Sequence, residues 1–192
     1  MCIRDRSIDV LAYDPEAARE LMWSAGVRAL RVEVLYPRRP STQDLPEILQ
    51  QQWRKTLGAE VVMSVQEEKA WLQRRNALQY RGVAERGWWG DYLDPNSFLE
   101  PFLSGPSIIG SGWSDPRYDS MLAAANASAD PSERMRKLAH CERFLLRAMP
   151  ILPLYYNTLT YLQKPYVRGL EPRKVDIMRF KYASIDTNWR PS

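Results

Sequence analysis

The stretch "ALRVEVLY", residues 29–36, alternates apolar and charged side chains with the period of two that indicates a half-buried β-strand. An amphipathic segment over residues 43–57 predicts a helix that ends at Gly58, and residues 61–65 predict a second strand. A strand, a helix and a strand joined in this way normally pair in parallel through a right-handed crossover. The sequence therefore predicts an α/β fold.

Asp-Pro pairs punctuate the chain and predict helix starts, because Asp accepts hydrogen bonds from free backbone N–H groups and Pro at the first helical position loses none. Four such pairs occur, at Asp14-Pro15, Asp94-Pro95, Asp115-Pro116 and Asp130-Pro131. With the apolar periodicity they predict helices at 15–25, 67–78, 115–127 and 130–148, a short strand within 79–89, an extended segment over 149–166 and a last strand near 177–182. In the first helix we expect Leu21 and Met22 to face inward.

The overall charge is balanced and dispersed. The 192 residues carry 27 Lys+Arg and 23 Asp+Glu, a net charge of +4, and basic residues are interleaved with acids. Such a pattern is typical of solvated surfaces, so we expect no nucleic-acid partner. No apolar run approaches the ~18 residues of a membrane span, so we expect no transmembrane segment.

Acids lie beside large aromatic side chains in "GWWGDYLDPNSFLEPF", residues 87–102, as they do in glycoside hydrolases. Asp94 is assigned to a helix start, however, and this leaves Asp91 without a paired acid nearby. We therefore expect no enzyme activity and no catalytic residue. A carbohydrate-binding or glycoside-hydrolysing domain that uses Asp91 and Glu100 stays as the alternative.

Other chemistry lacks its usual residue patterns. The single histidine, His140, precedes Cys141 on a predicted helix, where adjacent side chains point about 100° apart and do not face each other. The two cysteines form neither a CxxC pair nor a metal-ligand set, and neither a phosphate-binding loop nor a dinucleotide motif occurs. We expect no metal and no cofactor.

The segment Trp88 to Tyr92 suits a bound amine. Alternation along a strand would send Trp88 and Trp89 to opposite faces, one in the core and one at the surface. A bend at Gly90 would then hold the Asp91 carboxylate beside an indole face. An ammonium group is satisfied by such a pair, because the carboxylate supplies charge and the aromatic face supplies cation–π attraction.

Four segments together resemble one family. They are "YDPEAARELMWSAG", "GWWGDYLDPNSFLEPFLSG", "GWSDPRYDSMLAAA" and "MPILPLYYNTLTYLQKPYVRGL". In this order and spacing they resemble the bacterial extracellular solute-binding proteins of family 5, the oligopeptide- and dipeptide-binding components of ABC importers. The resemblance covers nearly all of residues 8–192.

The resemblance implies a two-lobed periplasmic-binding-protein type 2 fold that closes on its ligand and performs no chemistry. Family members are typically much longer, so we expect a truncated C-terminal lobe with a mixed sheet flanked by helices. Residues 1–7 fit no element and are expected to be a non-native leader. By the resemblance, residues 8–156 form the second ligand-binding lobe, and residues 157–192 cross the hinge and add terminal strands to the missing first lobe.

The resemblance also implies roles for single residues. In peptide-binding relatives the position of Asp91 holds the α-ammonium group of the peptide, Trp88 and Trp89 match residues that wall the same pocket, and the tyrosines of "PLYY" lie at the hinge edge. This chain departs from the family at Glu85, where relatives often carry arginine. We expect ligand contacts from Trp88, Trp89, Asp91, Tyr92, Arg86, Tyr155, Tyr156 and Asn157.

The expected partners follow from the family. They are a peptide ligand and the permease subunits of an ABC importer, with the membrane reached only through the permease or a lost lipid anchor. We expect a monomer in the periplasm, or one lipid-anchored outside a single-membrane bacterium. Because family members also bind non-peptide solutes, a receptor for such a solute is a second alternative. A scaffold role is the third, and a buried Asp91 neutralised by an internal arginine would favour it.

Overall fold

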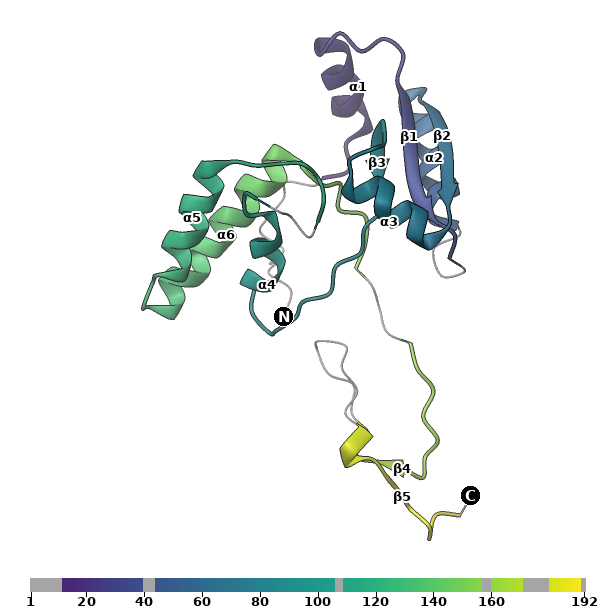
Figure 1. The fold of residues 1–192 in the computed structure, drawn as a ribbon, viewed down its shortest axis with the longest axis vertical. Helices are drawn as coiled ribbons and strands as arrows, with labels where there is room; N and C mark the ends of the chain where they lie inside the picture. The colour runs from purple at the N-terminus through teal and green to yellow at the C-terminus, as the bar shows by residue number, and fades with distance from the viewer. Residues whose placement is uncertain (1–11, 40–43, 106–108, 157–159, 171–179, 191–192) are drawn as a thin grey trace. The chain divides into compact units, whose positions relative to one another are not determined.

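The computed structural model describes residues 12–39, 44–105, 109–156, 160–170 and 180–190 (Figure 1). These residues form two compact units. The sheet unit holds the described residues up to Gly87 together with those from Phe102 to Pro116. The helical unit holds Trp88 to Pro101 and the described residues from Arg117 onward.

A three-stranded parallel sheet forms the centre of the sheet unit. Its strands are β1 (Arg31–Pro37), β2 (Glu60–Gln66) and β3 (Gly82–Ala84), in the order β2-β1-β3. Both pairs, β1 with β2 and β1 with β3, are parallel, which confirms the predicted strand-helix-strand unit. The expectation of a mixed sheet is wrong for these three strands. Helices α2 (Asp44–Leu57) and α3 (Glu68–Asn76) return the chain to the same end of the sheet before each new strand, so the strands run parallel.

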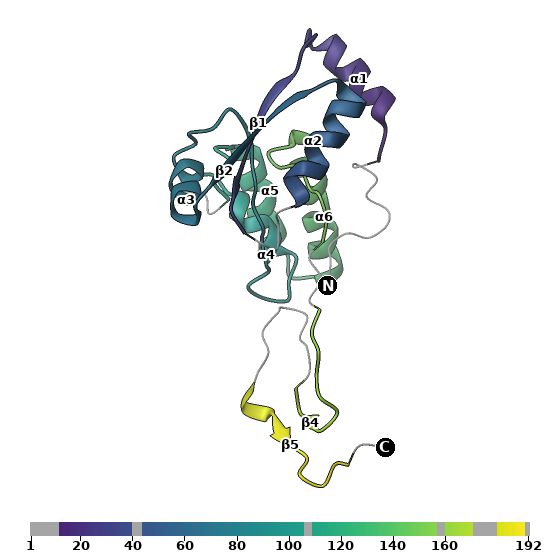
Figure 2. The same ribbon diagram turned by 90° about the vertical axis from the view of Figure 1, so that its right-hand side faces the viewer.

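The helices cover both faces of this sheet. Figures 1 and 2 show α3 on one face and α2, with α1 (Pro15–Ser24) beside it, on the other. Alternation along β1 explains the arrangement: Val34 belongs to a buried cluster that includes Trp53 and Leu57 of α2, whereas its neighbour Glu33 bonds to Arg74 of α3.

Helix α1 forms as predicted but buries nothing. The Asp14 side chain accepts a hydrogen bond of 2.9 Å from the Ala17 N–H, and Gly26 takes the left-handed conformation (φ +76°) after the helix. The expectation that Leu21 faces inward is wrong, since Leu21 is 69% exposed. The helix packs on α2, and none of its residues is buried.

Three helices build the core of the helical unit: α4 (Asn96–Leu99), α5 (Pro116–Asn126) and α6 (Pro131–Ala148). Short 3-10 turn η2 (Glu100–Phe102) continues α4. The buried Tyr118 hydroxyl donates to the Leu99 carbonyl at 2.8 Å, and burial raises the pKa of this phenol. Asp130 caps α6 by accepting from the N–H groups of Ser132 and Glu133, as the Asp-Pro pattern predicts.

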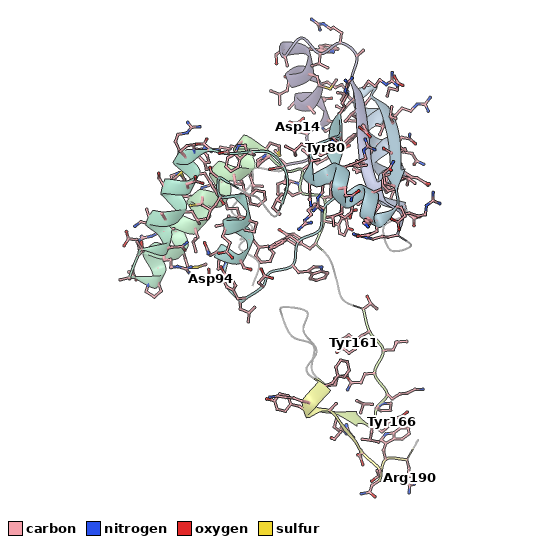
Figure 3. The ribbon with its side chains drawn as sticks, viewed as in Figure 1. Asp14, Tyr80, Asp94, Tyr161, Tyr166 and Arg190 are labelled. Carbon is pink, nitrogen blue, oxygen red and sulfur yellow. The ribbon has the colours of Figure 1, made fainter. Side chains whose placement is uncertain are left out.

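The described C-terminal residues form a small antiparallel pair, β4 (Val167–Arg168) with β5 (Ser184–Ile185). A strand is predicted near 177–182, but residues 180–182 form the 3-10 helix η3 (Phe180–Tyr182) and residues 177–179 lie outside the described ranges. Tyr166, labelled in Figure 3, packs against Trp189 with ring centroids 5.5 Å apart. Among the described helices, none has the length and apolar composition to cross a membrane.

Candidate functional site

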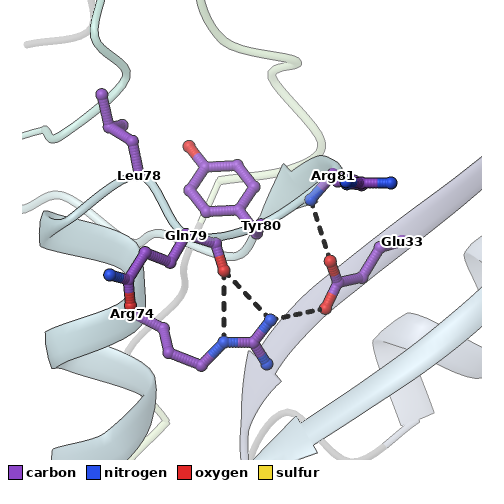
Figure 4. Close-up of a pocket in the computed structure, with 6 residues that line it drawn as sticks. All are labelled: Glu33, Arg74, Leu78, Gln79, Tyr80 and Arg81. Atoms are coloured by element: carbon purple, nitrogen blue, oxygen red, sulfur yellow. Dashed lines mark hydrogen bonds and ion pairs between the residues drawn. The ribbon is translucent and has the colours of Figure 1, made fainter.

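One hollow of the sheet unit is lined by a hydrogen-bonded network (Figure 4). It measures about 490 Å³ and is lined by Glu33, Arg74, Leu78, Gln79, Tyr80 and Arg81. Glu33 accepts from the Arg81 N–H at 2.9 Å and from Arg74 at 3.0 Å, and the Arg81 hydrogen bond is the main reason that the pKa of Glu33 is lowered. Arg74 also donates to the Gln79 carbonyl at 3.0 Å. These contacts tie the α3–β3 connection to β1, so the Glu33 carboxylate is already paired.

The Asp91 loop, residues 88–92 of the helical unit, carries the predicted amine site. Asp91 is exposed, and its backbone N–H donates to the Ser97 hydroxyl at 2.7 Å. Within the described ranges, the Asp91 carboxylate makes neither a hydrogen bond nor an ion pair. The backbone of the loop is therefore held in place while the negative charge is left available.

Ser97 fixes the loop through two contacts that the sequence did not reveal. It is fully buried at the start of α4; its hydroxyl accepts from Asp91, and its carbonyl accepts from the Trp88 indole N–H at 2.8 Å. Trp88 is consequently half-buried, whereas Trp89 is 48% exposed. A Cβ at Gly90 would lie 2.8 Å from the Phe98 ring, so only glycine lets the loop pack this closely on α4.

A chain of side-chain amides supports the same loop. Asn96 is buried; its amide nitrogen donates to the Tyr92 hydroxyl and to Glu100, each at 2.9 Å, and its oxygen accepts from Asn126 at 3.0 Å. Burial raises the pKa of Tyr92, and the nearby Glu100 adds to this. Glu100, the second acid of the glycosidase alternative, is thus engaged in the support of Tyr92.

Asp94 has a structural role beside the start of α4, although the residue in the cap position is Pro95 and not Asp94 as the sequence predicts. It accepts from the Asn96 N–H at 2.8 Å at the start of α4 and forms a two-point ion pair with Arg134 of α6, at 2.6 and 2.9 Å. Figure 3 labels Asp94 in the helical unit. The hydrogen bond from Arg134 is the main reason that the pKa of Asp94 is lowered. Asp91 and Asp94 therefore differ: one carboxylate is free and the other holds two helices together.

A second group of charges lies in the sheet unit, where the three parallel strands end. We call it the edge cluster, and its members are Arg39, Glu68, Trp71, Arg75, Glu85 and Arg86. Arg39 bonds to Glu68 through Nε at 2.8 Å and through Nη2, and lies 4.0 Å from Glu85. The guanidinium groups of Arg39 and Arg75 both lie over the Trp71 ring, 5.0 and 4.6 Å from its centroid.

The remaining predicted ligand contacts are distributed differently. Arg86 lies in the sheet unit, not in the unit of Asp91, and burial lowers its pKa. Tyr155 and Tyr156 are exposed residues of the helical unit that follow α6. Asn157 lies outside the described residues. No group of three or more His, Cys, Asp or Glu side chains suited to a metal ion occurs in the part of the chain that the structure describes.

Comparison with known proteins identifies relatives over most of the chain. Dipeptide-binding protein DppE of Bacillus subtilis is 29% identical over 152 residues, 79% of this chain and 28% of the relative. The probable deoxycholate-binding periplasmic protein YgiS of Escherichia coli is 30% identical over 155 residues, again 79% of this chain and 29% of the relative. The murein tripeptide binding protein MppA of Escherichia coli superposes with a TM-score of 0.81 at 28% identity, over 89% of this chain and 34% of that one.

The matches cover similar fractions of the relatives' lengths. The chain spans about three-tenths of the length of the curated relatives that it matches. The sequence profile described as "Bacterial extracellular solute-binding proteins, family 5 Middle" matches residues 4–109, which is more than half of the chain. The α/β arrangement therefore corresponds to part of a solute-binding protein, and the chain belongs to family 5 of the bacterial extracellular solute-binding proteins.

Proposed function

We propose that the chain is part of a receptor that captures peptides for an ABC importer. The observation that carries the proposal is the exposed, unpaired carboxylate of Asp91, held on a loop whose backbone is fixed by buried Ser97. A receptor for amines needs such a charge in a fixed position, because a preorganised group loses little freedom when the ligand binds. The relatives DppE and MppA, a dipeptide-binding and a murein tripeptide-binding protein, support the same class of ligand.

In this proposal Asp91 pairs with the α-ammonium group of the peptide, and Trp88, Trp89 and Tyr92 surround that group. The exposed indole of Trp89 offers cation–π attraction, which adds about 0.5–1 kcal/mol at an exposed site. Residues 8–156 belong to the second lobe, and 157–192 cross to the first. Further ligand contacts come from Arg86, Tyr155, Tyr156 and Asn157.

The receptor has no chemistry of its own in this proposal. It delivers the bound peptide to permease subunits, from the periplasm or from a lipid anchor on the outer surface of a single-membrane cell. The coupling of ligand binding to lobe closure follows from charge: a carboxylate is costly to bury alone and much less costly with its ammonium partner.

A second candidate is a receptor for a non-peptide solute, and the name of the relative YgiS favours it. Deoxycholate carries a carboxylate and no ammonium group, so an unpaired Asp91 carboxylate would repel it. The two candidates therefore make opposite predictions for the removal of the Asp91 charge.

Calorimetric titration of the complete gene product containing this chain tests the proposal. We expect tripeptides with a free N-terminus to bind, and we expect both N-acetylation of the peptide and the substitution Asp91→Asn to weaken binding at least tenfold, since each removes one charge of a charge-assisted pair. Asp44→Asn, which removes an exposed carboxylate from α2, is the matched control and should leave the affinity unchanged.

Two results would reject the assignment of Asp91. One is equal affinity of wild type and Asp91→Asn for the same tripeptide. The other is tighter binding of deoxycholate than of any peptide, with a further gain in Asp91→Asn, which would select the non-peptide candidate.

A further inference from the structure

Helix α6 carries a row of basic side chains on the face that it turns to solvent. We call this row the basic stripe, and its members are Arg136, His140, Arg143 and Arg147. Positions separated by four, three and four residues lie within about 60° of one another around a helix and extend over about 16 Å along it. The stripe is therefore one narrow surface, although other residues separate its members in the sequence.

The stripe lies on the opposite side of α6 from the core. The buried side of the helix includes Leu138, Cys141 and Leu145, none of which is more than 3% exposed. Within the stripe, Arg143 is half-buried and the other three residues are exposed. The basic groups are consequently accessible on the surface of the helical unit.

Acidic side chains do not neutralise the stripe. Within the part of the chain that the structure describes, Arg143 and Arg147 make neither a hydrogen bond nor an ion pair. Arg136 acts electrostatically on Glu133, but that carboxylate is already paired with Lys137 at 3.0 Å. The stripe therefore keeps a net positive charge.

Helix stability does not explain such a row. Like charges four residues apart, as in Arg143 and Arg147, repel each other and disfavour the helix. The helix dipole favours a cation only in the last turn, which accounts for Arg147 but not for Arg136. Solvated surfaces usually mix charges of both signs along one face. An external anion that lies against the stripe would relieve the repulsion.

The residues around the stripe favour a fluid anionic partner over a protein. Protein interfaces are usually centred on large apolar or aromatic side chains. From Pro131 to Ala148, a range that the structure describes throughout, no large apolar side chain is exposed. A lipid surface needs no such anchor, because its headgroups can move to meet the charges, and guanidinium groups pair well with phosphate.

We propose that the basic stripe docks the protein on the phosphate groups of an anionic membrane surface. The contact is peripheral and electrostatic, so salt weakens it. It adds a direct contact to the two membrane routes that the family implies, the permease and a lipid anchor. In the receptor proposed above, this contact keeps the protein close to its permease, but it does not depend on which solute the receptor binds.

Co-sedimentation of the complete gene product with vesicles tests the stripe. The protein is produced without lipid modification. One set of vesicles is phosphatidylcholine alone, and the other is an equal mixture of phosphatidylcholine and phosphatidylglycerol. At low salt we expect at least tenfold stronger binding to the anionic set, since each arginine near a charged surface contributes about fivefold. The preference should disappear at ~0.5 M salt.

Two triple variants assign the preference to the stripe. The test variant combines Arg136→Gln, Arg143→Gln and Arg147→Gln. The control variant combines substitutions of three exposed arginines on separate elements of the sheet unit, Arg28→Gln, Arg38→Gln and Arg54→Gln. Both variants lose three positive charges, but only the test variant loses them from one face. We expect the test variant to lose the anionic preference and the control variant to keep most of it.

A single variant covers the case in which circular dichroism shows that the test variant is unfolded. Arg147→Glu reverses one exposed charge at the end of the stripe and should lower the preference at least fivefold.

Three results would overturn the proposal: equal binding of wild type to the two sets of vesicles, an unchanged preference in the test variant, or equal losses in the test and control variants. The last result would assign the preference to net charge alone. Binding of wild type to neutral vesicles only when permease subunits are present in them, with a loss in the test variant, would assign the stripe to an acidic protein surface instead. All of these results leave peptide capture by the Asp91 loop untouched.

Discussion

In the helical unit, the Asp91 carboxylate is exposed while neutral hydrogen bonds from buried Ser97 and half-buried Trp88 fix its loop. In the sheet unit, the Arg75 guanidinium is buried and its surroundings are other charges. In the first arrangement the groups that hold the loop are neutral, so they do not neutralise the Asp91 carboxylate. In the second, each charge alters the others, so removal of one group changes the whole cluster. Substitutions at the two places should therefore behave differently.

The largest loss of stability is expected in the helical unit, for Arg134→Gln. The variant breaks the two-point ion pair with Asp94, whose partners are both about three-quarters buried, and we expect a decrease of about 2 kcal/mol in the free energy of unfolding, between the values for exposed and buried pairs. Urea unfolding of the complete gene product measures it.

The same variant makes a prediction about pH. The pKa of Asp94 is lowered in the folded state, so its contribution to stability is present above the unfolded pKa and lost as the pH falls through the folded pKa. Wild type and Arg134→Gln should therefore converge in strong acid. Lys137→Gln, which breaks an exposed pair with Glu133 on α6, is the control and should cost less than about 0.5 kcal/mol. Equal losses for the two variants would show that the Asp94 pair does not join the helices.

A smaller effect is expected for Ser97→Ala, which removes a neutral support and leaves the Asp91 charge in place. The Asp91 N–H loses its buried acceptor, so we expect about 1 kcal/mol less stability and a few-fold loss of peptide affinity, far short of the loss for Asp91→Asn. Ser132→Ala, an exposed serine in the first turn of α6, is the control. If Ser97→Ala binds peptide like wild type in calorimetry, the hydroxyl does not help to position the loop.

The sequence alone predicted the features that depend on residues close to one another along the chain. Alternation in residues 29–36 predicted β1, the Asp-Pro pairs predicted the starts of α1 and α6, and elimination separated Asp91 from Asp94. The first of these succeeded because the period of side-chain burial is a local property of a strand.

The failures concern contacts between distant segments. Apolar periodicity in α1 does not say which element the helix meets, and it meets α2, so Leu21 stays exposed. The bonds of Asn96 to Asn126 and of Asp94 to Arg134 link positions 30 and 40 residues apart, and no pattern within either segment announces them. The burial of Arg75 arises in the same way, since an arginine in an otherwise polar helix is normally exposed.

The smallest change in stability, and the one that bears most on the edge cluster, is expected for Glu85→Gln. The pKa of Glu85 is raised in the folded state, chiefly by burial, so the folded state favours the protonated acid. The contribution of protonated Glu85 to the free energy of unfolding is complete below the pKa of the unfolded state and is lost as the pH rises through the pKa of the folded state. Glutamine resembles the protonated acid, so Glu85→Gln should match wild type near pH 3 and be more stable at pH 7, by less than about 1 kcal/mol.

The sign of the stability difference between Glu85→Gln and wild type at pH 7 decides between two descriptions of the edge cluster. Glu68→Gln is the comparison variant, because the hydrogen bond with Arg39 lowers the pKa of this exposed acid. A gain for Glu85→Gln beside a loss for Glu68→Gln means that Glu85 is a poor counter-ion for Arg75. A loss for Glu85→Gln means that Glu85 already neutralises Arg75.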